Sequence, residues 1–332
     1  MRILLVKLSS LGDIVHTLPV VQDILAAMPD AQIDWVLEKS FAPLLSQVEG
    51  LRRIIPCELR RWRKSIWTAQ TRCEWRSFKA DLQTGQYDAV IDLQGLTKSA
   101  VVSRLARVAP QGRRYAMANQ TDGSGYEAPT RWVADVTVPL TRRLHAVARG
   151  RHLAAAALGY SLINTVNYGL KVTEDYVIRA QKAPEKVAKK ILFIHGTSRL
   201  DKTWPLQHWV DLGQRMAASG YQVNLMHGNA KELATSQSVA AQLPGSTCVL
   251  PLLALDALTC EMARCSGAIG VDSGVNHIAV ALGLPHVQIY NFDTAWRTGP
   301  QGSSHQLSVF SPGGPSVDTV YQAWLACEST AS

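Results

Sequence analysis

The chain has 332 residues, of which 47% are hydrophobic and 18% charged, a balance that buries ample apolar surface and excludes a disordered protein. This length predicts two domains of roughly 150 residues each, or one large α/β unit. The net charge of +8 lies entirely in residues 1–165, which carry 22 Lys and Arg against 14 Asp and Glu. A large anionic partner should therefore bind the first half, and nucleic acid, an anionic membrane and a phosphorylated substrate all fit on charge alone.

The sequence shows no sign of export or membrane insertion. Polar residues and proline interrupt the long uncharged runs, so no stretch has the ~20 consecutive apolar residues of a membrane span. Arg2 and Lys7 bracket only four apolar residues, too few for a signal-peptide core. We therefore expect a cytosolic protein. The six cysteines include no CxxC pair and no histidine at metal spacing, which argues against a zinc ribbon and a disulfide framework.

The first half alternates short β-rich runs with stretches of helical period. Strands are expected at Ile3–Leu8, Ile33–Leu37, Arg53–Pro56 and Ala89–Leu93. Helices are expected at Ile14–Met28, Phe41–Val48, Ile66–Thr84, Lys98–Val108 and His145–Leu158. Between the last two helices, Arg113–Arg143 has no clean period, which predicts a long surface loop with room for one short strand.

The second half repeats the alternation. Strands are expected at Ile191–His195, Gln222–Met226, Thr247–Leu250, Ala268–Val271 and His286–Tyr290. Helices are expected at Pro205–Ser219, Lys231–Gln242, Leu255–Arg264, Val275–Leu282 and Val317–Cys327. The pattern predicts an α/β fold of two Rossmann-like domains, joined near Asn164–Ala183 and facing a central cleft. Ligands then belong at the carboxyl ends of the strands.

The first predicted strand ends in Lys7-Leu-Ser-Ser-Leu-Gly-Asp13, and a helix begins at once. Asp13 suits two roles there. It can cap the helix, which is worth about 1 kcal/mol and is the commoner use of such an aspartate. It can also lie at the carboxyl end of the strand and accept a proton from a substrate hydroxyl. The motif is no dinucleotide fingerprint, because GxGxxG is absent from the chain.

Arg60-Arg-Trp-Arg-Lys64 is a cationic block. Such a run is usually a solvated surface, but arginine forks also match phosphate and carboxylate oxygens. The apolar neighbours Leu59, Ile66 and Trp67 argue against a free basic tail. No recognised nucleic-acid-binding motif accompanies the block.

Three further polar segments follow predicted strands. Asp92, in Tyr87–Ser99, can cap, bond an arginine or face the cleft, and its spacing does not decide among these. The loop His195–Pro205 offers hydroxyls, backbone N–H groups and Lys202 to a diphosphate, although an ordinary connection is equally common.

The third segment, Gly270–His277, leads into a helix whose N-terminus favours negative charge. Gly274 lets the backbone approach a ligand, Asp272 suits a sugar hydroxyl or a cap, and His277 on its own is more often structural. No Asp-x-Asp motif occurs, so we do not expect the divalent-metal site typical of single-domain nucleotide-sugar transferases.

Together these segments resemble the lipopolysaccharide heptosyltransferases, and among them the type I family. The resemblance runs in order from residue 1 to about residue 290 and is carried by Met1–Pro19, Arg60–Lys64, Asp92–Ser99, His145–Val147, Leu158–Ser161, Asp201–Pro205, Val271–Gly274 and His277. The type II family shares the Gly-Asp opening and the Asp-Ser/Thr-Gly segment. The Arg-Arg-Trp-Arg-Lys block favours type I.

The resemblance implies a GT-B glycosyltransferase with a basic acceptor domain (1–168), a donor domain (169–315) and a C-terminal helix (316–332) packing back toward the first domain. It implies inverting transfer of L-glycero-D-manno-heptose from ADP-heptose to a Kdo sugar of Kdo2-lipid A, without metal or cofactor, in lipopolysaccharide inner-core biosynthesis. It also implies a cytoplasmic protein attached peripherally to the inner leaflet of the cytoplasmic membrane, with no nucleic-acid partner.

By motif match, the resemblance makes Asp13 the candidate general base. The donor diphosphate falls to Thr197, Ser198 and Lys202. Heptose and phosphate fall to Asp272, Ser273, Gly274 and His277. Glu232 would meet the adenosine ribose and Leu253 the base, on weaker local matches. Kdo carboxylates or lipid A phosphates fall to Arg60, Arg61, Arg63 and Lys64.

Two segments depart from the family pattern. The family usually has Tyr-Gly-Pro-Thr-Asp-Pro after its last strand, whereas this chain has Tyr290-Asn-Phe-Asp-Thr294, which leaves the sugar contacts of Asn291–Thr294 open. The family's Ala-Arg-Glu is here Gly125-Tyr-Glu127, so an acceptor-binding arginine is missing at Tyr126. Arg131 is an open candidate to replace it.

Two alternatives stand beside this interpretation. One is a type II heptosyltransferase or a related nucleotide-sugar transferase, which acceptor choice would separate. The other is a non-catalytic protein that binds anionic lipid or nucleic acid; Asp13 and Lys202 would then be dispensable, and affinity would fall steeply with salt. The missing glycine fingerprint disfavours a dinucleotide oxidoreductase.

Overall fold

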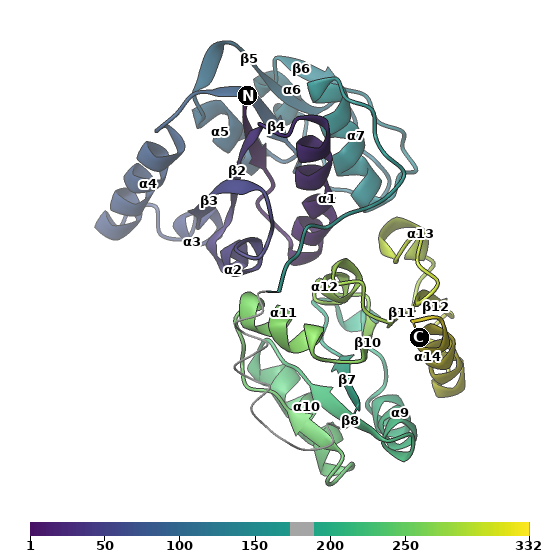
Figure 1. Cartoon of the computed structure of the whole chain (residues 1–332). Helices are drawn as coiled ribbons and strands as arrows, with labels where there is room; N and C mark the ends of the chain where they lie inside the picture. The colour runs from purple at the N-terminus through teal and green to yellow at the C-terminus, as the bar shows by residue number, and fades with distance from the viewer. Residues whose placement is uncertain (173–188, 332) are drawn as a thin grey trace. The chain divides into compact units, whose positions relative to one another are not determined.

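The computed structural model describes residues 1–172 and 189–331, and the chain divides into two compact units, Met1–Lys171 and Val172–Ser332 (Figure 1). The boundary falls within the joint expected near Asn164–Ala183, of which residues 173–183 lie outside the described part of the chain. No helix in the described part is long and apolar enough to cross a membrane.

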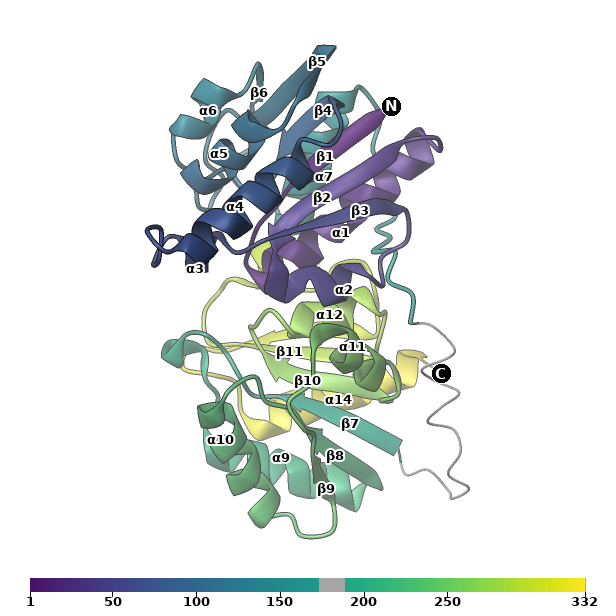
Figure 2. The same ribbon diagram turned by 90° about the vertical axis from the view of Figure 1, so that its left-hand side faces the viewer.

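The first unit is built on one six-stranded parallel sheet with the strand order β3-β2-β1-β4-β5-β6. Helices α4 and α5 cover one face, where they pack on buried residues of β1 and β2, and α1 and α7 pack together on the other face (Figure 2). The strands are β1 (Arg2–Val6), β2 (Gln32–Glu38), β3 (Leu51–Cys57), β4 (Tyr87–Asp92), β5 (Val108–Met117) and β6 (Val136–Val138). The helices are α1 (Leu11–Ala27), α2 (Ala42–Leu45), α3 (Leu59–Trp62), α4 (Ala69–Leu82), α5 (Thr97–Leu105), α6 (Pro129–Val133) and α7 (Ala146–Leu158), with the 3₁₀ turn η1 (Lys39–Phe41).

The second unit repeats the plan with the strand order β12-β11-β10-β7-β8-β9, again parallel throughout. Its strands are β7 (Lys189–Ile194), β8 (Tyr221–Leu225), β9 (Thr247–Val249), β10 (Gly267–Val271), β11 (His286–Tyr290) and β12 (Gln306–Phe310). Its helices are α9 (Leu206–Ala218), α10 (Ala230–Ala241), α11 (Leu255–Ala263), α12 (Asn276–Ala281), α13 (Ala295–Thr298) and α14 (Val317–Ala331), with the 3₁₀ turn η2 (Leu200–Lys202).

Both sheets place their first strand at the centre and add later strands on either side. The order reverses between β1 and β4 in the first unit and between β7 and β10 in the second. In doubly wound sheets, ligands bind at the carboxyl ends of the strands at this reversal point. The predicted α/β class is confirmed, and each unit offers one such point.

The region Arg113–Arg143 is more regular than its sequence indicates, because it holds the end of β5 together with α6 and β6. β5 contains Pro110 and Gly112, and its pairing with β4 is irregular, which hides the two-residue period. A Cβ atom on Gly112 would lie 2.5 Å from the carbonyl oxygen of Tyr87, so only glycine fits there. The helix expected to reach Val108 ends at Leu105, because Val108 is the first residue of β5 and pairs with Tyr87.

The C-terminal helix α14 belongs to the second unit. Its apolar side, including Val320, Trp324 and Cys327, is buried in the core that α9 and the second sheet share. The expectation that this helix packs back toward the first unit stays a prediction. The strand before it, β12, was not predicted, since its sequence Gln-Leu-Ser-Val-Phe gives only a short alternation at the sheet edge.

Candidate functional site

Asp13 lies in the first turn of α1, at the point where the order of the first sheet reverses. Its Oδ2 accepts hydrogen bonds from the backbone N–H of Ser10 (3.1 Å) and the hydroxyl of Ser10 (2.9 Å). Its Oδ1 lies 3.5 Å from both Lys7 Nζ and the Arg149 guanidinium. The side chain is 33% exposed. One oxygen thus caps the helix, the other meets two cations, and a third of the side chain is open to solvent.

The two cations set the ionisation of Asp13. Burial raises the pKa of Asp13, but the charges of Lys7 and Arg149 and the Ser10 N–H outweigh it and hold that pKa well below its usual range. Lys7 itself is 3% exposed, donates to the carbonyl oxygen of Leu93 (3.0 Å), and has its pKa lowered by burial. Asp13 is therefore a carboxylate at any physiological pH.

Sequence reasoning gave no role to Lys7 or Arg149. Lys7 opens the motif Lys7–Asp13, in which only Asp13 was given a role. Arg149 lies on α7, which packs against α1, and it also donates to Thr121 Oγ1 (3.4 Å). His145, the N-cap of α7, was part of the family resemblance, and Arg149 follows it by one helical turn, so this spacing was the available signal.

Asp92 shapes the loop beside Asp13. Its Oδ1 accepts from the backbone N–H groups of Gln94 (2.9 Å) and Gly95 (3.1 Å), and its Oδ2 accepts from the Ser99 hydroxyl (2.9 Å). Gln94 Oε1 then accepts from the N–H groups of Leu8 and Ser9, both at 3.1 Å. Of the three roles left open, these contacts match the cap, because Asp92 accepts from the backbone N–H groups of the turn after β4. Burial raises its pKa to about 6 against these hydrogen bonds.

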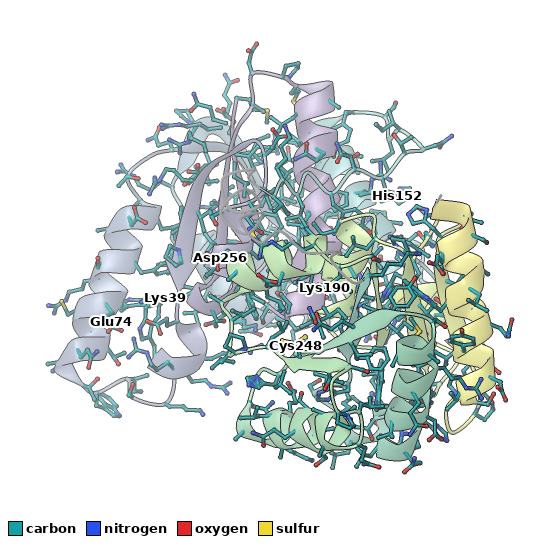
Figure 3. All side chains as sticks on the ribbon, turned by 60° about the horizontal axis from the view of Figure 1, so that its bottom comes forward. Lys39, Glu74, His152, Lys190, Cys248 and Asp256 are labelled. Carbon is teal, nitrogen blue, oxygen red and sulfur yellow. The ribbon has the colours of Figure 1, made fainter. Side chains whose placement is uncertain are left out.

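The cationic block divides into two parts. Arg60, Arg63 and Lys64 are exposed. Arg61 instead pairs with Glu58 (2.9 Å) and with Glu74, the residue of α4 labelled in Figure 3. Glu74 also accepts from the indole N–H of Trp62 (2.7 Å). Arg61 therefore braces the segment between α3 and α4, unlike the other three cations.

Tyr126 stands where the family pattern has an arginine. Its hydroxyl donates to the carbonyl oxygen of Ala118 (2.9 Å), and the neighbouring Glu127 accepts from the N–H of Thr97 (2.7 Å). The segment is thus tied to β5 and α5. Arg131 is exposed on α6.

In the second unit, the reversal point brings together three of the predicted donor residues. Lys202, at the end of η2, places its Nζ 2.5 Å from Asp272 Oδ2. Thr197, in the loop after β7, donates from its hydroxyl to the carbonyl oxygen of Asp272 (3.2 Å). The pairing of Lys202 with Asp272 was not predicted, because the two lie 70 residues apart in sequence.

Ser273 and Gly274 form the turn between β10 and α12. The Ser273 hydroxyl oxygen is buried and has no hydrogen-bond partner among the described residues. Helix α12 spans only Asn276–Ala281, shorter than predicted, so the helix dipole expected there is weak. The unsatisfied Ser273 hydroxyl can donate to an anion, and the nearby cation is Lys202, which is paired with Asp272.

His277 is 5% exposed within α12. Burial lowers the pKa of the neighbouring His286 to about 4, and the charge of His277 adds a smaller lowering of that pKa. His286 is itself fixed by a bond between its Nδ1 and the carbonyl oxygen of Ala268 (3.0 Å). His277 therefore belongs, with His286, to the buried part of the second unit.

A pocket of about 270 Å³ connects Thr197 to Glu232. Glu232 is held by the N–H of Gly228, which donates to Oε2 (2.7 Å). A Cβ atom on Gly196 would lie 2.6 Å from the Glu232 carboxyl carbon, so a larger residue there would push the Glu232 side chain aside. Two other predicted donor residues do not line this pocket: Ser198 is exposed, and Leu253 is half-buried in the loop after β9.

The loop after β11, which departs from the family pattern, holds the turn Asp201–Thr203, called the lysine turn below. Asn291 Nδ2 donates to the carbonyl oxygens of Asp201 (2.9 Å) and Thr203 (3.0 Å), the residues on either side of Lys202. Asn291, which stands where the sequence departs from the family pattern, therefore helps to hold Lys202 in place.

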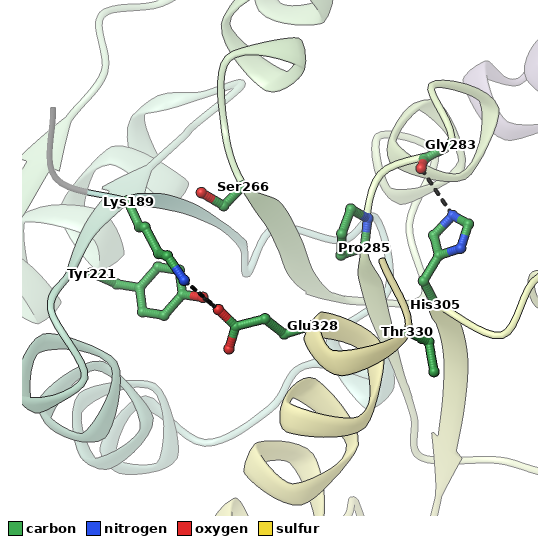
Figure 4. A pocket seen from close by; sticks show the side chains of 8 residues that line it. All are labelled: Lys189, Tyr221, Ser266, Gly283, Pro285, His305, Glu328 and Thr330. Atoms are coloured by element: carbon green, nitrogen blue, oxygen red, sulfur yellow. Dashed lines mark hydrogen bonds and ion pairs between the residues drawn. The ribbon is translucent and has the colours of Figure 1, made fainter. Parts of the chain in front are cut away.

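A second pocket of the same unit, about 530 Å³, lies at the opposite, amino-terminal edge of the sheet (Figure 4). Its charged groups satisfy one another, since Glu328 accepts from Lys189 Nζ (2.7 Å) and from the Tyr221 hydroxyl (2.5 Å). It is separate from the site built around Lys202. Among residues 1–172 and 189–331, no three or more His, Cys, Asp or Glu side chains gather in a way that could hold a metal ion.

Comparison with known proteins shows which proteins the chain resembles. The model of glycosyltransferase family 9 (heptosyltransferase) matches residues 75–321. Lipopolysaccharide heptosyltransferase 1 of Pseudomonas aeruginosa is 37% identical over 306 residues, which cover 92% of this chain and 82% of that protein. Lipopolysaccharide heptosyltransferase 2 of Escherichia coli is 26% identical over 328 residues, which cover 93% and 87%.

Among solved structures, the E. coli heptosyltransferase WaaC with ADP matches with a TM-score of 0.84 and 32% identity, covering 97% of this chain and 98% of that one. This match confirms the predicted GT-B architecture, since the likeness extends over both α/β units.

Proposed function

Because the chain belongs to glycosyltransferase family 9, the heptosyltransferase family, we propose that it is a type I enzyme of lipopolysaccharide inner-core biosynthesis. It moves L-glycero-D-manno-heptose from ADP-heptose to a Kdo sugar of Kdo2-lipid A, with inversion at the anomeric carbon. The observation that carries this proposal is Asp13, an ionised and accessible carboxylate at the reversal point of the first sheet, in a chain 37% identical to a heptosyltransferase 1.

Asp13 Oδ1 accepts the proton of the attacking Kdo hydroxyl. Ser10 orients the carboxylate by bonding Oδ2, and Lys7 and Arg149 keep it charged. The new C–O bond forms on the face of heptose opposite the ADP oxygen, and the bond to that oxygen breaks. A carboxylate of low pKa is a weak base, so the proton moves late, when the hydroxyl has become acidic by bonding to carbon.

On the donor side, Lys202 neutralises the negative charge that develops on the departing diphosphate, without a divalent cation or other cofactor. Thr197, Ser198, Ser273 and the backbone at Gly274 provide further donors. Asp272 holds Lys202 and, with His277, forms the wall near heptose. Glu232 binds the ribose in the 270 Å³ pocket, and Leu253 meets the adenine.

On the acceptor side, Arg60, Arg63 and Lys64 contact Kdo carboxylates and lipid A phosphates, and Arg61 holds their segment in place. The first half carries the whole net charge of +8, which suits such an anionic acceptor. The enzyme works in the cytoplasm, at the inner leaflet of the cytoplasmic membrane, where that acceptor is found.

The test is to incubate the purified chain with ADP-heptose and Kdo2-lipid A in EDTA, and to follow ADP release together with the mass and anomeric configuration of the lipid product. A gain of one heptose with inverted configuration supports the proposed donor, acceptor, stereochemistry and metal independence. Transfer only to an already heptosylated core would assign the chain to type II, and a requirement for added Mg²⁺ would refute metal independence. No transfer of heptose to either acceptor would favour a non-catalytic binding protein.

A further inference from the structure

The first unit carries an apolar groove beside its cationic block. The groove has a volume of about 540 Å³, and its apolar lining comes from α3, α4, α5 and the segment between α3 and α4, including Trp62, Trp75, Ile66 and Val101. Because Val101 is 45% exposed and Ile66 51%, the lining opens onto the surface. Such an exposed apolar patch marks a site of interaction.

Trp67 extends this surface. It lies next to Ile66 in the segment between α3 and α4, and it is 84% exposed. A tryptophan that projects this far from a folded unit gains nothing from the protein core. Tryptophan at such a position is typical of membrane interfaces, where the ring enters the headgroup region.

The charges around the groove are all of one sign. Arg63, Arg72, Arg76 and Lys98 line it, and none of the described residues that line it is acidic. Glu74, the nearest acid on α4, is already held by Arg61 and Trp62. Arg63, Arg72 and Arg76 form no ion pair in the described part of the chain, so their charge is available to an anionic partner.

The groove also leads toward the reactive carboxylate. Lys98, which lines it, donates to the Ser9 hydroxyl (2.8 Å), and the next residue, Ser10, holds Asp13. A partner bound along the groove is therefore presented beside the catalytic loop within the same unit.

We propose that this surface docks the protein on an anionic lipid bilayer, with Ile66 and Trp67 entering the interface and Arg72 and Arg76 on the phosphate headgroups. Aliphatic Ile66 and Val101 do not stack on bases, so the surface suits lipid better than nucleic acid. The biological meaning rests on the proposed function, since an acceptor anchored in a membrane brings the enzyme there, but the docking itself requires no turnover.

The experiment is co-sedimentation with vesicles of phosphatidylcholine, with and without phosphatidylglycerol. The whole chain should bind the anionic vesicles and not the neutral ones. Ile66→Ser/Trp67→Ser should weaken the partition about tenfold. Arg72→Gln/Arg76→Gln should weaken it about fivefold for each cation removed. Matched controls in the same unit are Trp132→Ser, an indole that is 77% exposed, and Arg107→Gln, an exposed arginine; both should bind as the unaltered chain does.

The proposal would be overturned if the unaltered chain did not bind anionic vesicles, or if both double variants bound them as tightly as the unaltered chain does. A preference for a single-stranded oligonucleotide over vesicles would overturn it as well. Two further measurements separate other causes. Thermal unfolding of each variant should be unchanged, and heptose transfer to a water-soluble, fully deacylated acceptor should be unaltered. If the proposed function fails, the unaltered chain does not transfer to that soluble acceptor, whatever the vesicle result.

Discussion

Lys202 and Asp272 form an ion pair with Nζ and Oδ2 2.5 Å apart, the two side chains only 17% and 8% exposed. Lys202 follows β7 and Asp272 follows β10, so the pair joins the two loops at the reversal point of the second sheet. A diphosphate that binds Lys202 must share its ammonium with Asp272, which also fixes where that ammonium lies.

Replacing Lys202 should therefore remove transition-state stabilisation. Lys202→Met should lower kcat by about 10²–10³-fold, the usual effect of losing one such electrostatic donor. It also leaves Asp272 buried without its partner, so a loss of stability of about 3 kcal/mol is expected. Steady-state kinetics well below the melting temperature check the first effect and thermal unfolding the second. Lys202→Arg should recover part of the turnover, whereas Lys202→Met at native rates would rule out the assigned role.

Asn291 should act on the donor through the lysine turn. Asn291→Ala removes two hydrogen bonds to the carbonyl groups beside Lys202, which should raise KM for ADP-heptose about tenfold. Asn167→Ala is the matched control, because Asn167 also fixes a turn by one side-chain bond (to the Gly169 N–H) but lies in the other unit. Identical donor KM values for the two variants would show that the altered loop has no part in donor binding.

The fit of Gly196 against Glu232 gives a paired test of the pocket proposed to bind the ribose. Gly196→Ala places a methyl group 2.6 Å from the Glu232 carboxyl carbon and should displace that side chain, raising donor KM about tenfold. Gly228→Ala brings its methyl group only to 3.4 Å from the same carboxylate, an ordinary contact, and should change little. Calorimetric titration with ADP distinguishes the two, and equal affinities would place the ribose elsewhere.

Asp92 should make the first unit less stable as pH rises. Its folded pKa is about 6 against 3.8 for an ordinary aspartate, so between these values the folded state keeps a proton that the unfolded state has lost. The free energy of unfolding should then fall with rising pH across that window, by at most about 3 kcal/mol from this group. Asp92→Asn keeps the acceptor oxygen for Gln94 and Gly95 and should flatten that part of the curve. Denaturant unfolding from pH 4 to 7 measures this, and parallel curves for both proteins would contradict it.

Most of the fold was predictable because its helices and strands have clear apolar periods. The buried run Ile3–Val6 and the motif after it identified the first strand and helix correctly. Two strands of mixed composition were not predicted. β5 is interrupted by Pro110 and Gly112, and β12 is a short edge strand. Periodicity carries no signal for strands of this kind.

Local motifs singled out Asp13 and Lys202 as candidate site residues, and their roles stay predictions. Sequence reasoning did not find the partners of these two residues, because the partners come from distant segments of the chain. Arg149 reaches Asp13 across 136 residues, and Asp272 reaches Lys202 across 70. Such pairings follow from the way helices pack on the sheet and from the order of its strands, which a single sequence does not state.

The cap formed by Asp13 can be separated from its role in the reaction. Ser10→Ala removes the hydroxyl donor to Oδ2 but leaves the carboxylate and its cations, so it should lower stability by about 1 kcal/mol and keep most of the turnover. Thermal unfolding and steady-state kinetics on one preparation check both. A loss of turnover as deep as that expected for Asp13 itself would show that orientation by Ser10 controls the reaction.

The most direct test of the whole account is heptose transfer to Kdo2-lipid A by Asp13→Asn, measured beside ADP binding to the same preparation. Asparagine retains the size and the cap but cannot take a proton, so kcat should fall by about 10³–10⁴-fold while the Kd for ADP stays unchanged. Near-native transfer by Asp13→Asn would contradict the assignment of Asp13 as the base, and with it the mechanism proposed for this chain.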